Sequence, residues 1–209
     1  MDIKNARGRF IVLEGIDGAG KTTQAEQLEA HLVANGRRVY RTAEPTSLPT
    51  GVALREALGG KVKKTECEMA AMFVLDRIAH NTHPTEGIVA ILESGQDIIC
   101  DRYYYSTLAY QGHATDYEWT KSMNLGCPEI IKPDLCIYLD LTPEQSLDRI
   151  SRGRDSVEIY ENLETLERVR TAFMRVFEDL GKCDNIKIVN AYRSPEEIAK
   201  EIAHIVDEL

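Results

Sequence analysis

A glycine-rich stretch near the start of the chain carries the strongest chemical signal in the sequence. It fits the pattern G-x-x-x-x-G-K-[ST], in which the glycines let the backbone curl until its N–H groups face phosphate oxygens. The lysine of such a loop reaches the β- and γ-phosphates, and its last hydroxyl ligates Mg²⁺. The residues predicted to hold a nucleoside triphosphate are Gly15, Ile16, Asp17, Gly18, Ala19, Gly20, Lys21, Thr22 and Thr23.

Asp17 is an unexpected residue inside this loop, because an anion at that position should repel phosphate. Its carboxylate makes chemical sense if it points away from the phosphates, toward a group that carries a hydroxyl. The alternative is an exposed loop carboxylate with no partner. The residues of the loop alone leave both interpretations open.

A second candidate for phosphate chemistry follows the apolar run 98–100, where Asp101 and Arg102 stand side by side. A carboxylate at the end of such a strand can orient Mg²⁺ or its waters, so Asp101 joins Thr22 as a predicted metal ligand. The guanidinium of Arg102 could form a two-pronged contact with the phosphate of an acceptor. The alternative is a helix cap followed by a surface arginine.

Three arginines, Arg149, Arg152 and Arg154, lie within six residues of an otherwise acidic chain. Phosphoryl transfer needs positive charge around the transferring group, and arginines on a closing segment supply it. The alternative is a solvated, charged helix end. Three classes of protein compete at this point: a small-molecule kinase, a GTP switch and an ATP-driven assembly or transport protein. The switch is disfavoured because no N-K-x-D motif follows the apolar run 135–140.

The elements that must position these residues alternate between strands and helices, which predicts an α/β fold with a parallel sheet covered on both faces. Ligands of such sheets bind beyond the carboxyl ends of the strands, where the candidate residues fall. No linker or repeat is evident, so we predict one domain over 1–209. The predicted strands are 10–13, 37–42, 97–101, 135–140 and 186–189; the predicted helices are 21–34, 54–58, 66–81 with a continuation at 88–92, 143–150, 163–180 and a last one capped at 194–196.

Composition narrows the possible partners. The chain has 209 residues, 43% of them apolar, and a formal net charge of −9, which disfavours a general nucleic-acid binder. We find no apolar run long enough to span a membrane and no signal peptide. Five cysteines without C-x-x-C spacing fit a reducing cytosol, so we expect a cytoplasmic protein.

The motifs, taken in their order along the chain, resemble those of the nucleoside monophosphate kinases, and among them the thymidylate kinases. The match covers nearly the whole chain and includes the loop at 14–23, Glu44 with Pro45, Phe73 with the residues 76–80, and 132–141. Its most specific part is 101–112. The resemblance implies a three-layer P-loop fold with a short arginine-bearing lid at about 149–160. It also implies direct in-line transfer from Mg-ATP to dTMP, which yields dTDP for dTTP synthesis, and a homodimer.

The resemblance also assigns roles to residues of the acceptor site. Phe73 would stack on thymine and Arg77 would hydrogen-bond the base, while Tyr110 would pack near the sugar. Arg102 would hold the acceptor phosphate and Asp17 the deoxyribose 3′-hydroxyl. Phe73 and Tyr110 could equally be plain core residues. Further residues expected close to dTMP are Ser106, Thr107, Gln111 and Tyr160.

On the ATP side, the resemblance places Arg149 against adenine, which the loop 190–192 would border. Two departures from the family pattern matter. Ala43 stands where many relatives have an arginine for the acceptor phosphate, so Arg102 would carry a larger share, with possible help from Arg55. Gly18 stands where some relatives place an arginine in the phosphate loop, which leaves the transition-state charge to the lid. The predicted catalytic residues are Lys21, Asp101, Arg102, Arg152 and Arg154.

Two other functions stay open on sequence grounds. One is a kinase for a deoxynucleoside or for another nucleoside monophosphate, because the same loop and arginines would serve it. The other is an ATP-binding switch that uses the loop to change shape without transferring a phosphoryl group.

Overall fold

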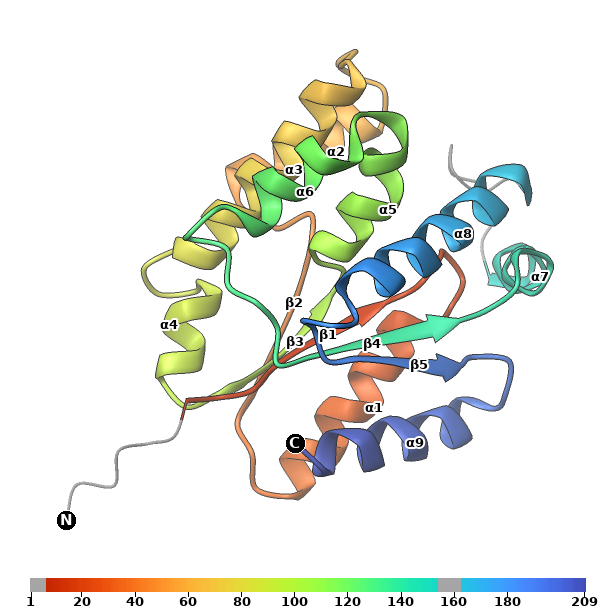
Figure 1. The fold of residues 1–209 in the computed structure, drawn as a ribbon. Coiled ribbons are helices and arrows are strands. Elements are labelled where there is room, and N and C mark those ends of the chain that lie inside the picture. Colours follow the sequence, from red (N-terminus) through yellow and green to blue (C-terminus); the bar gives the residue numbers. More distant parts are fainter. Residues whose placement is uncertain (1–6, 154–162) are drawn as a thin grey trace.

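A five-stranded parallel sheet forms the centre of the protein, in the strand order β2-β3-β1-β4-β5 (Figure 1). The computed structural model describes residues 7–153 and 163–209. All five predicted strands are present and parallel, so the α/β fold is confirmed. The strands are β1 (Phe10–Glu14), β2 (Val39–Ala43), β3 (Asp97–Asp101), β4 (Leu135–Asp140) and β5 (Ile186–Asn190).

The central strands are buried on both faces, as their continuous apolar runs predict. The edge strands β2 and β5 differ, since only one neighbour pairs with each and helices cover them less completely. Ile188 of β5 is 52% exposed. The predicted strand at 186–189 is thus present, as an edge strand that is partly exposed.

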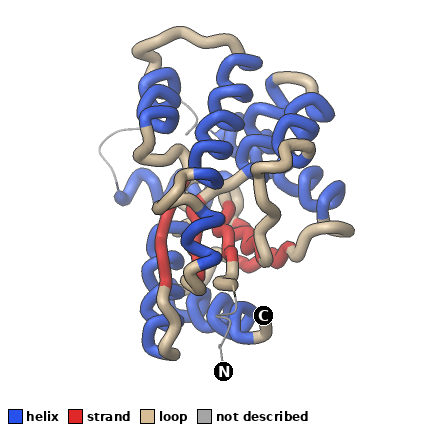
Figure 2. The backbone as a smooth tube through the Cα atoms, turned by 90° about the vertical axis from the view of Figure 1, so that its left-hand side faces the viewer, coloured by secondary structure: helices blue, strands red, loops and turns tan. Residues whose placement is uncertain are grey.

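Alternating side chains of the central strands build two cores, which makes the fold three-layered. Ile11 and Leu13 face α1 (Lys21–Ala34) and α9 (Pro195–Asp207). Phe10 and Val12 face the opposite side, where α5 (Tyr104–Ala114) and α8 (Leu163–Leu180) pack. Figure 2 shows the strands between these two groups of helices.

The other helices cluster mainly beyond the second face of the sheet, where α2 packs on α3 and α6 packs on α5 (Figure 1). The sequence did not lead us to predict α5 or α6, because α5 is buried nearly all round and shows no amphipathic stripe. Pro49 begins α2 five residues before the predicted start, and α4 is a separate helix rather than a continuation of α3. The remaining bounds are α2 (Pro49–Leu58), α3 (Glu66–Thr82), α4 (Ile88–Glu93), α6 (Tyr117–Leu125) and α7 (Pro143–Gly153).

Asp97 anchors the amino end of β3, at the edge of the sheet opposite the candidate site. Its side chain is fully buried and accepts the Arg9 backbone N–H at 2.8 Å, together with the guanidinium groups of Arg9 and Arg37. Burial alone would raise the pKa of Asp97, but the hydrogen bonds from Arg37 and Arg9 outweigh it and lower the pKa to about 2. The ionised carboxylate therefore stabilises the folded state.

We expect Asp97→Asn to lower the free energy of unfolding by about 2 kcal/mol at pH 7, since the pKa falls from 3.8 to about 2 on folding. A lowered carboxyl pKa contributes stability above about pH 4, and that stability is lost as the pH falls toward 2. Urea unfolding of both proteins between pH 7 and pH 3 should therefore show a shrinking difference. Asp207→Asn is the control, because Asp207 is an exposed partner of His31 and should cost under about 0.5 kcal/mol. A pH-independent difference for Asp97→Asn would contradict this account.

Candidate active site

A cavity of about 420 Å³ opens at the carboxyl edge of the sheet, where the candidate residues were expected to meet. Its walls come from the loops that follow β1, β2 and β3 and from the end of α7. The cavity therefore brings the phosphate loop together with the Asp-Arg pair that follows β3. The lining residues are Asp17, Gly18, Gly20, Lys21, Thr22, Thr23, Ala43, Glu44, Asp101, Arg102, Arg149 and Ile150.

The phosphate loop joins β1 to α1, as the motif requires. Gly20 precedes α1 with a φ of 94°, in the left-handed region that glycine adopts without strain, and no side chain caps the helix. The first N–H groups of α1 thus remain available to an anion. Lys21 is buried and its Nζ donates to the carbonyls of Gly15, at 3.0 Å, and Ile16, at 3.3 Å. Burial lowers the pKa of Lys21, and nearby Arg102 lowers it further.

Gly18 lies tightly against α7. It has a φ of 78°, and a Cβ added there would lie 3.0 Å from the Ser146 carbonyl oxygen and 3.1 Å from Ile150 Cγ1. The Ser146 hydroxyl also donates to the Asp17 carbonyl, which ties the loop to α7. A side chain at position 18 would therefore strain the backbone and require α7 to move by a few tenths of an ångström.

Arg102 stands in the left-handed region of the backbone, with a φ of 69°, which is strained for any residue except glycine. The buried carboxylate of Glu14 holds the turn in this shape. It accepts the Tyr103 backbone N–H at 2.8 Å and the Ser106 hydroxyl at 2.6 Å. Burial raises the pKa of Glu14, while Arg102 and these hydrogen bonds lower it. We gave Glu14 no role from the sequence, although an acid that ends an otherwise apolar strand was a usable signal.

The guanidinium of Arg102 gathers several of the predicted acceptor residues. It forms an ion pair with Asp17 and donates to the Ser106 hydroxyl at 3.1 Å. Its carbon lies 5.5 Å from the centre of the Tyr110 ring, within cation–π range. Burial raises the pKa of Tyr110 to about 12, although Arg102 lowers it, so the phenol stays neutral at physiological pH. A cation, an anion and an aromatic ring thus meet at one side of the cavity.

The cavity contains the two residues that were predicted to hold Mg²⁺. Asp101 and Thr22 both line the cavity, and Thr22 is exposed. Among the described residues, Asp101 Oδ1 is buried without a hydrogen-bond partner, as expected of an oxygen reserved for a ligand. Mg²⁺ prefers oxygen ligands and commonly takes one or two from the protein and the rest from phosphates and waters. The residues present therefore fit this ion.

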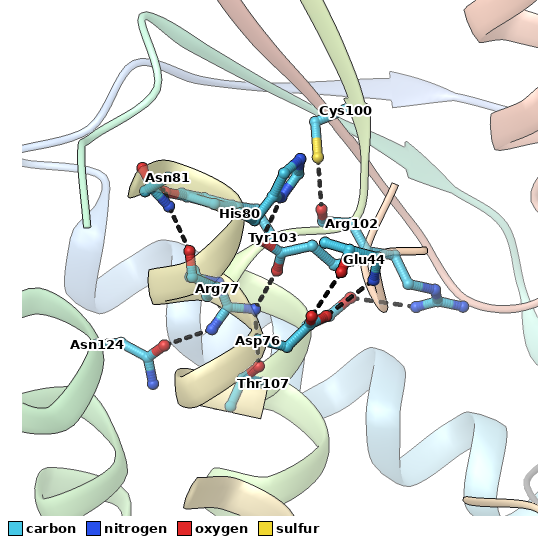
Figure 3. A network of polar contacts seen from close by, with 12 residues as sticks. Glu44, Asp76, Arg77, His80, Asn81, Cys100, Arg102, Tyr103, Thr107 and Asn124 are labelled. Atoms are coloured by element: carbon cyan, nitrogen blue, oxygen red, sulfur yellow. Dashed lines mark hydrogen bonds and ion pairs between the residues drawn. The ribbon is translucent and has the colours of Figure 1, made fainter. Parts of the chain in front are cut away.

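Arg77 lies behind the cavity rather than in its wall, in a buried network (Figure 3). The side chain is 1% exposed and donates to Asn124 Oδ1 at 2.5 Å, Glu44 Oε2 at 2.6 Å and Thr107 Oγ1 at 3.1 Å. Phe73 is half-buried and does not line the cavity either. The structure therefore brings Thr107 to Arg77, while the base end of the predicted acceptor site is set apart from the phosphate end.

The arginines that flank the site have distinct partners. Arg149 donates to the Ala191 carbonyl at 2.7 Å, which joins α7 to the loop 190–192 beside the phosphate loop. Arg55 donates to the carbonyls of Pro45, at 2.7 Å, and Thr46, at 2.6 Å. It braces the loop after β2 and is not among the residues that line the cavity, and its help at the acceptor phosphate stays a prediction.

Three predicted site residues have no side-chain placement. Arg152 belongs to the last turn of α7, but its side chain lies outside the part of the chain that is described. Arg154 and Tyr160 lie outside the described residues altogether. Gln111 of α5 is buried.

Comparison with known proteins agrees with this geometry. The sequence profile of the family described as thymidylate kinase matches residues 13–202. A probable thymidylate kinase of Methanococcus aeolicus is 40% identical over 93% of both chains, and one of Pyrococcus abyssi is 37% identical over 96% of both. A thymidylate kinase of Leptospira borgpetersenii is 36% identical over 94% of this chain and 92% of its own. With the phosphate loop, the Asp-Arg turn and the parallel sheet in place, this chain belongs to the thymidylate kinase family.

Proposed function

We propose that this protein transfers the γ-phosphoryl group of Mg-ATP directly to dTMP, which yields ADP and dTDP for dTTP synthesis. The observation that carries the proposal is the single cavity shared by two phosphate-binding elements. Lys21 and Thr22 line it from the triphosphate loop, and Asp101 and Arg102 line it from the turn after β3. A donor and an acceptor phosphate held by these elements would meet inside about 420 Å³.

The transfer needs positioning and charge neutralisation rather than a strong base. A phosphate oxygen of dTMP, already ionised, attacks the γ-phosphorus while the bond to the ADP oxygen breaks on the opposite side. Lys21 and the backbone N–H groups at the start of α1 hold the negative charge of the β- and γ-phosphates. Thr22 and Asp101 would hold Mg²⁺, which supplies further neutralisation when bound.

The acceptor end is assigned by matching residue chemistry to the parts of dTMP. Arg102 takes the phosphate and Asp17 the 3′-hydroxyl, so dTMP would exchange the ion pair between these residues for its own contacts. Tyr110 packs beside the sugar, Phe73 stacks on thymine, and Arg77 donates to the base. Arg77 Nε supports the last assignment, because within the described part of the chain this buried donor has no acceptor. Further acceptor-site residues in the proposal are Ser106, Thr107, Gln111 and Tyr160.

The donor end is assigned to the residues around α7. Arg149 lies between the phosphate loop and Ala191. We place the adenine of ATP against Arg149 and beside the loop 190–192. Arg152 and Arg154 complete the charge around the transferring group on a lid at about 149–160. The whole chain, 1–209, would form one catalytic domain.

We also propose that the protein acts in the cytoplasm as a homodimer that binds neither nucleic acid nor membrane. None of the helices described is both long and apolar enough to cross a bilayer. Leu75 of α3 is 55% exposed and Val52 of α2 is 47% exposed, on two helices that pack together. These exposed apolar side chains are candidates for the contact with a second copy.

ADP release from Mg-ATP, measured with a panel of acceptors, tests the reaction. We expect strong stimulation by dTMP, weaker stimulation by dUMP and none by thymidine. A methyl pocket separates thymine from uracil by only about 1–3 kcal/mol, so dUMP should be a poor substrate rather than an inert one. Chelation of the metal by EDTA should abolish the activity. Stimulation by thymidine would indicate a deoxynucleoside kinase instead, and hydrolysis without any acceptor would indicate a switch.

Lys21→Ala should reduce kcat by about two powers of ten or more, because it removes a charged donor from the transferring phosphates. Steady-state kinetics with dTMP measure the loss, and thermal unfolding checks that the variant is folded. Lys200→Ala is the matched control, since Lys200 is an exposed residue of α9 and should leave kcat unchanged. Near-normal turnover in Lys21→Ala would rule out the proposed role of the loop.

Arg152→Ala or Arg154→Ala should reduce kcat by about 10³-fold, by analogy with the arginines that neutralise transition-state charge in other phosphoryl transfers. The assignment predicts a large loss in at least one of the two variants. Arg168→Ala, an exposed change on α8, serves as the control. A mild loss in both lid variants would show that the transition-state charge is held elsewhere.

A further inference from the structure

The guanidinium of Arg77 is a buried charged group, and residues from three other segments of the chain hold it in place. The side chain is 1% exposed, and an unpaired charge in such a place is strongly destabilising. Glu44, which follows β2, supplies the counter-charge at 2.6 Å from Nη2. Thr107 of α5 accepts from the same nitrogen at 3.1 Å. Nη2 is thus held from two directions.

Asn124 of α6 holds the other terminal nitrogen. Its Oδ1 accepts from Arg77 Nη1 at 2.5 Å (Figure 3). The amide cannot turn freely, because its Nδ2 donates to the Thr120 carbonyl at 2.8 Å in the preceding helical turn. Asn124 is itself fully buried, so no water competes for these contacts. The amide therefore presents an oxygen to Arg77 in one fixed direction.

Glu44 is fixed in a similar way. Its Oε1 lies 2.9 Å from His80 Nδ1, and His80 Nε2 lies 2.8 Å from the Thr42 hydroxyl. Both carboxylate oxygens are thus occupied, one by Arg77 and one by His80. A guanidinium is planar and rigid, so anchoring both terminal nitrogens also fixes the direction of the third.

The third nitrogen, Nε, is buried and has no acceptor within the described residues. Since a buried donor without an acceptor costs about 1–3 kcal/mol, this N–H indicates a partner that the described residues do not supply. We infer that Asn124 is a positioning residue that sets the base specificity of the enzyme by aiming Arg77 Nε–H at the carbonyl oxygen at position 4 of the acceptor base. The inference rests on the proposed function, in which Arg77 faces the base.

The chemistry of this donor defines what it can distinguish. Thymine and uracil carry a carbonyl oxygen at position 4, whereas cytosine carries an amino group there. A fixed N–H accepts the first two bases and meets another donor in cytosine, which leaves a buried polar group unpaired. Asn124 should therefore act on the choice between dTMP and dCMP and leave the choice between dTMP and dUMP, which depends on the methyl group, unchanged.

The test compares kcat/KM for dTMP, dUMP and dCMP in the full-length protein and in Asn124→Leu, which keeps the branched shape of the side chain and removes the acceptor. We expect the preference for dTMP over dCMP to fall about tenfold, while the preference for dTMP over dUMP changes less than about twofold. KM for dTMP should rise several-fold with little change in kcat, because Asn124 does not line the cavity that contains the proposed phosphate-binding residues. Asn124→Ala provides a second removal of the acceptor in case the leucine variant does not fold.

Two further variants separate positioning from general damage. Asn124→Asp keeps an oxygen toward Nη1 and should retain the preference over dCMP. Thr120→Val is the matched control: it removes a buried hydroxyl that lies 2.8 Å from Thr115 Oγ1, on the same helix, without touching Arg77. It should lower the melting temperature and leave all three substrate ratios unchanged.

The possible outcomes are distinct. An unchanged ratio of kcat/KM for dTMP to that for dCMP in a folded Asn124→Leu or Asn124→Ala variant would overturn the inference. Equal losses of discrimination against dCMP and against dUMP would also overturn it. So would the loss of the preference for dTMP over dCMP in a folded Asn124→Asp variant. If the unsubstituted protein phosphorylates dCMP as well as dTMP, the proposed base recognition fails first, and Asn124 has no specificity to set.

Discussion

The pairing of β1 with β3 is the constraint on which the rest of the site depends. Their parallel register sets Leu13 beside Asp101, so the phosphate loop and the Asp-Arg turn leave the sheet at the same level. The Glu14 carboxylate then ties the two exits together through the backbone N–H groups of Tyr103 and Ser106. Burial raises the pKa of Glu14, which shows that ionising this carboxylate in the interior is unfavourable. The carboxylate nevertheless stabilises the strained backbone of Arg102 and so fixes its position relative to Lys21. Donor and acceptor phosphates require that distance to be constant.

The net charge of −9 is compatible with this chemistry because the cations are few and local. Lys21, Arg102 and Arg149 line the cavity, and backbone N–H groups at the start of α1 add positive potential without adding a residue charge. The negative net charge disfavours binding of long polyanions. A small phosphate ester meets only the cavity, so the protein can bind nucleotides without a basic face.

Much of this arrangement could be predicted from the sequence because it depends on short-range patterns. Continuous apolar runs identified the three central strands, and the loop motif placed Lys21 and Thr22 at the start of a helix. The patterns were insufficient where burial is uniform or contacts are distant. Helix α5 shows no alternation of apolar and polar faces in its sequence, because nearly all of its side chains are buried. The Arg55 side chain donates to two carbonyls that only the folded loop brings within reach, so no local pattern showed these contacts.

Asn124 illustrates the same limit in the acceptor site. It lies 47 residues from Arg77, on a helix whose polar sequence shows little apolar period, so no local pattern connects the two. The connection exists because α6 packs on α5, and α5 follows directly from the turn that carries Arg102. One chain of contacts thus runs from the phosphate end of the site to its base end through α5. A shift of α5 would move Arg102, Thr107 and, through α6, Asn124 together. Under the proposed roles of Arg77 and Arg102, this chain of contacts would link recognition of the base to placement of the phosphate, which would favour transfer to an acceptor that fits at both ends.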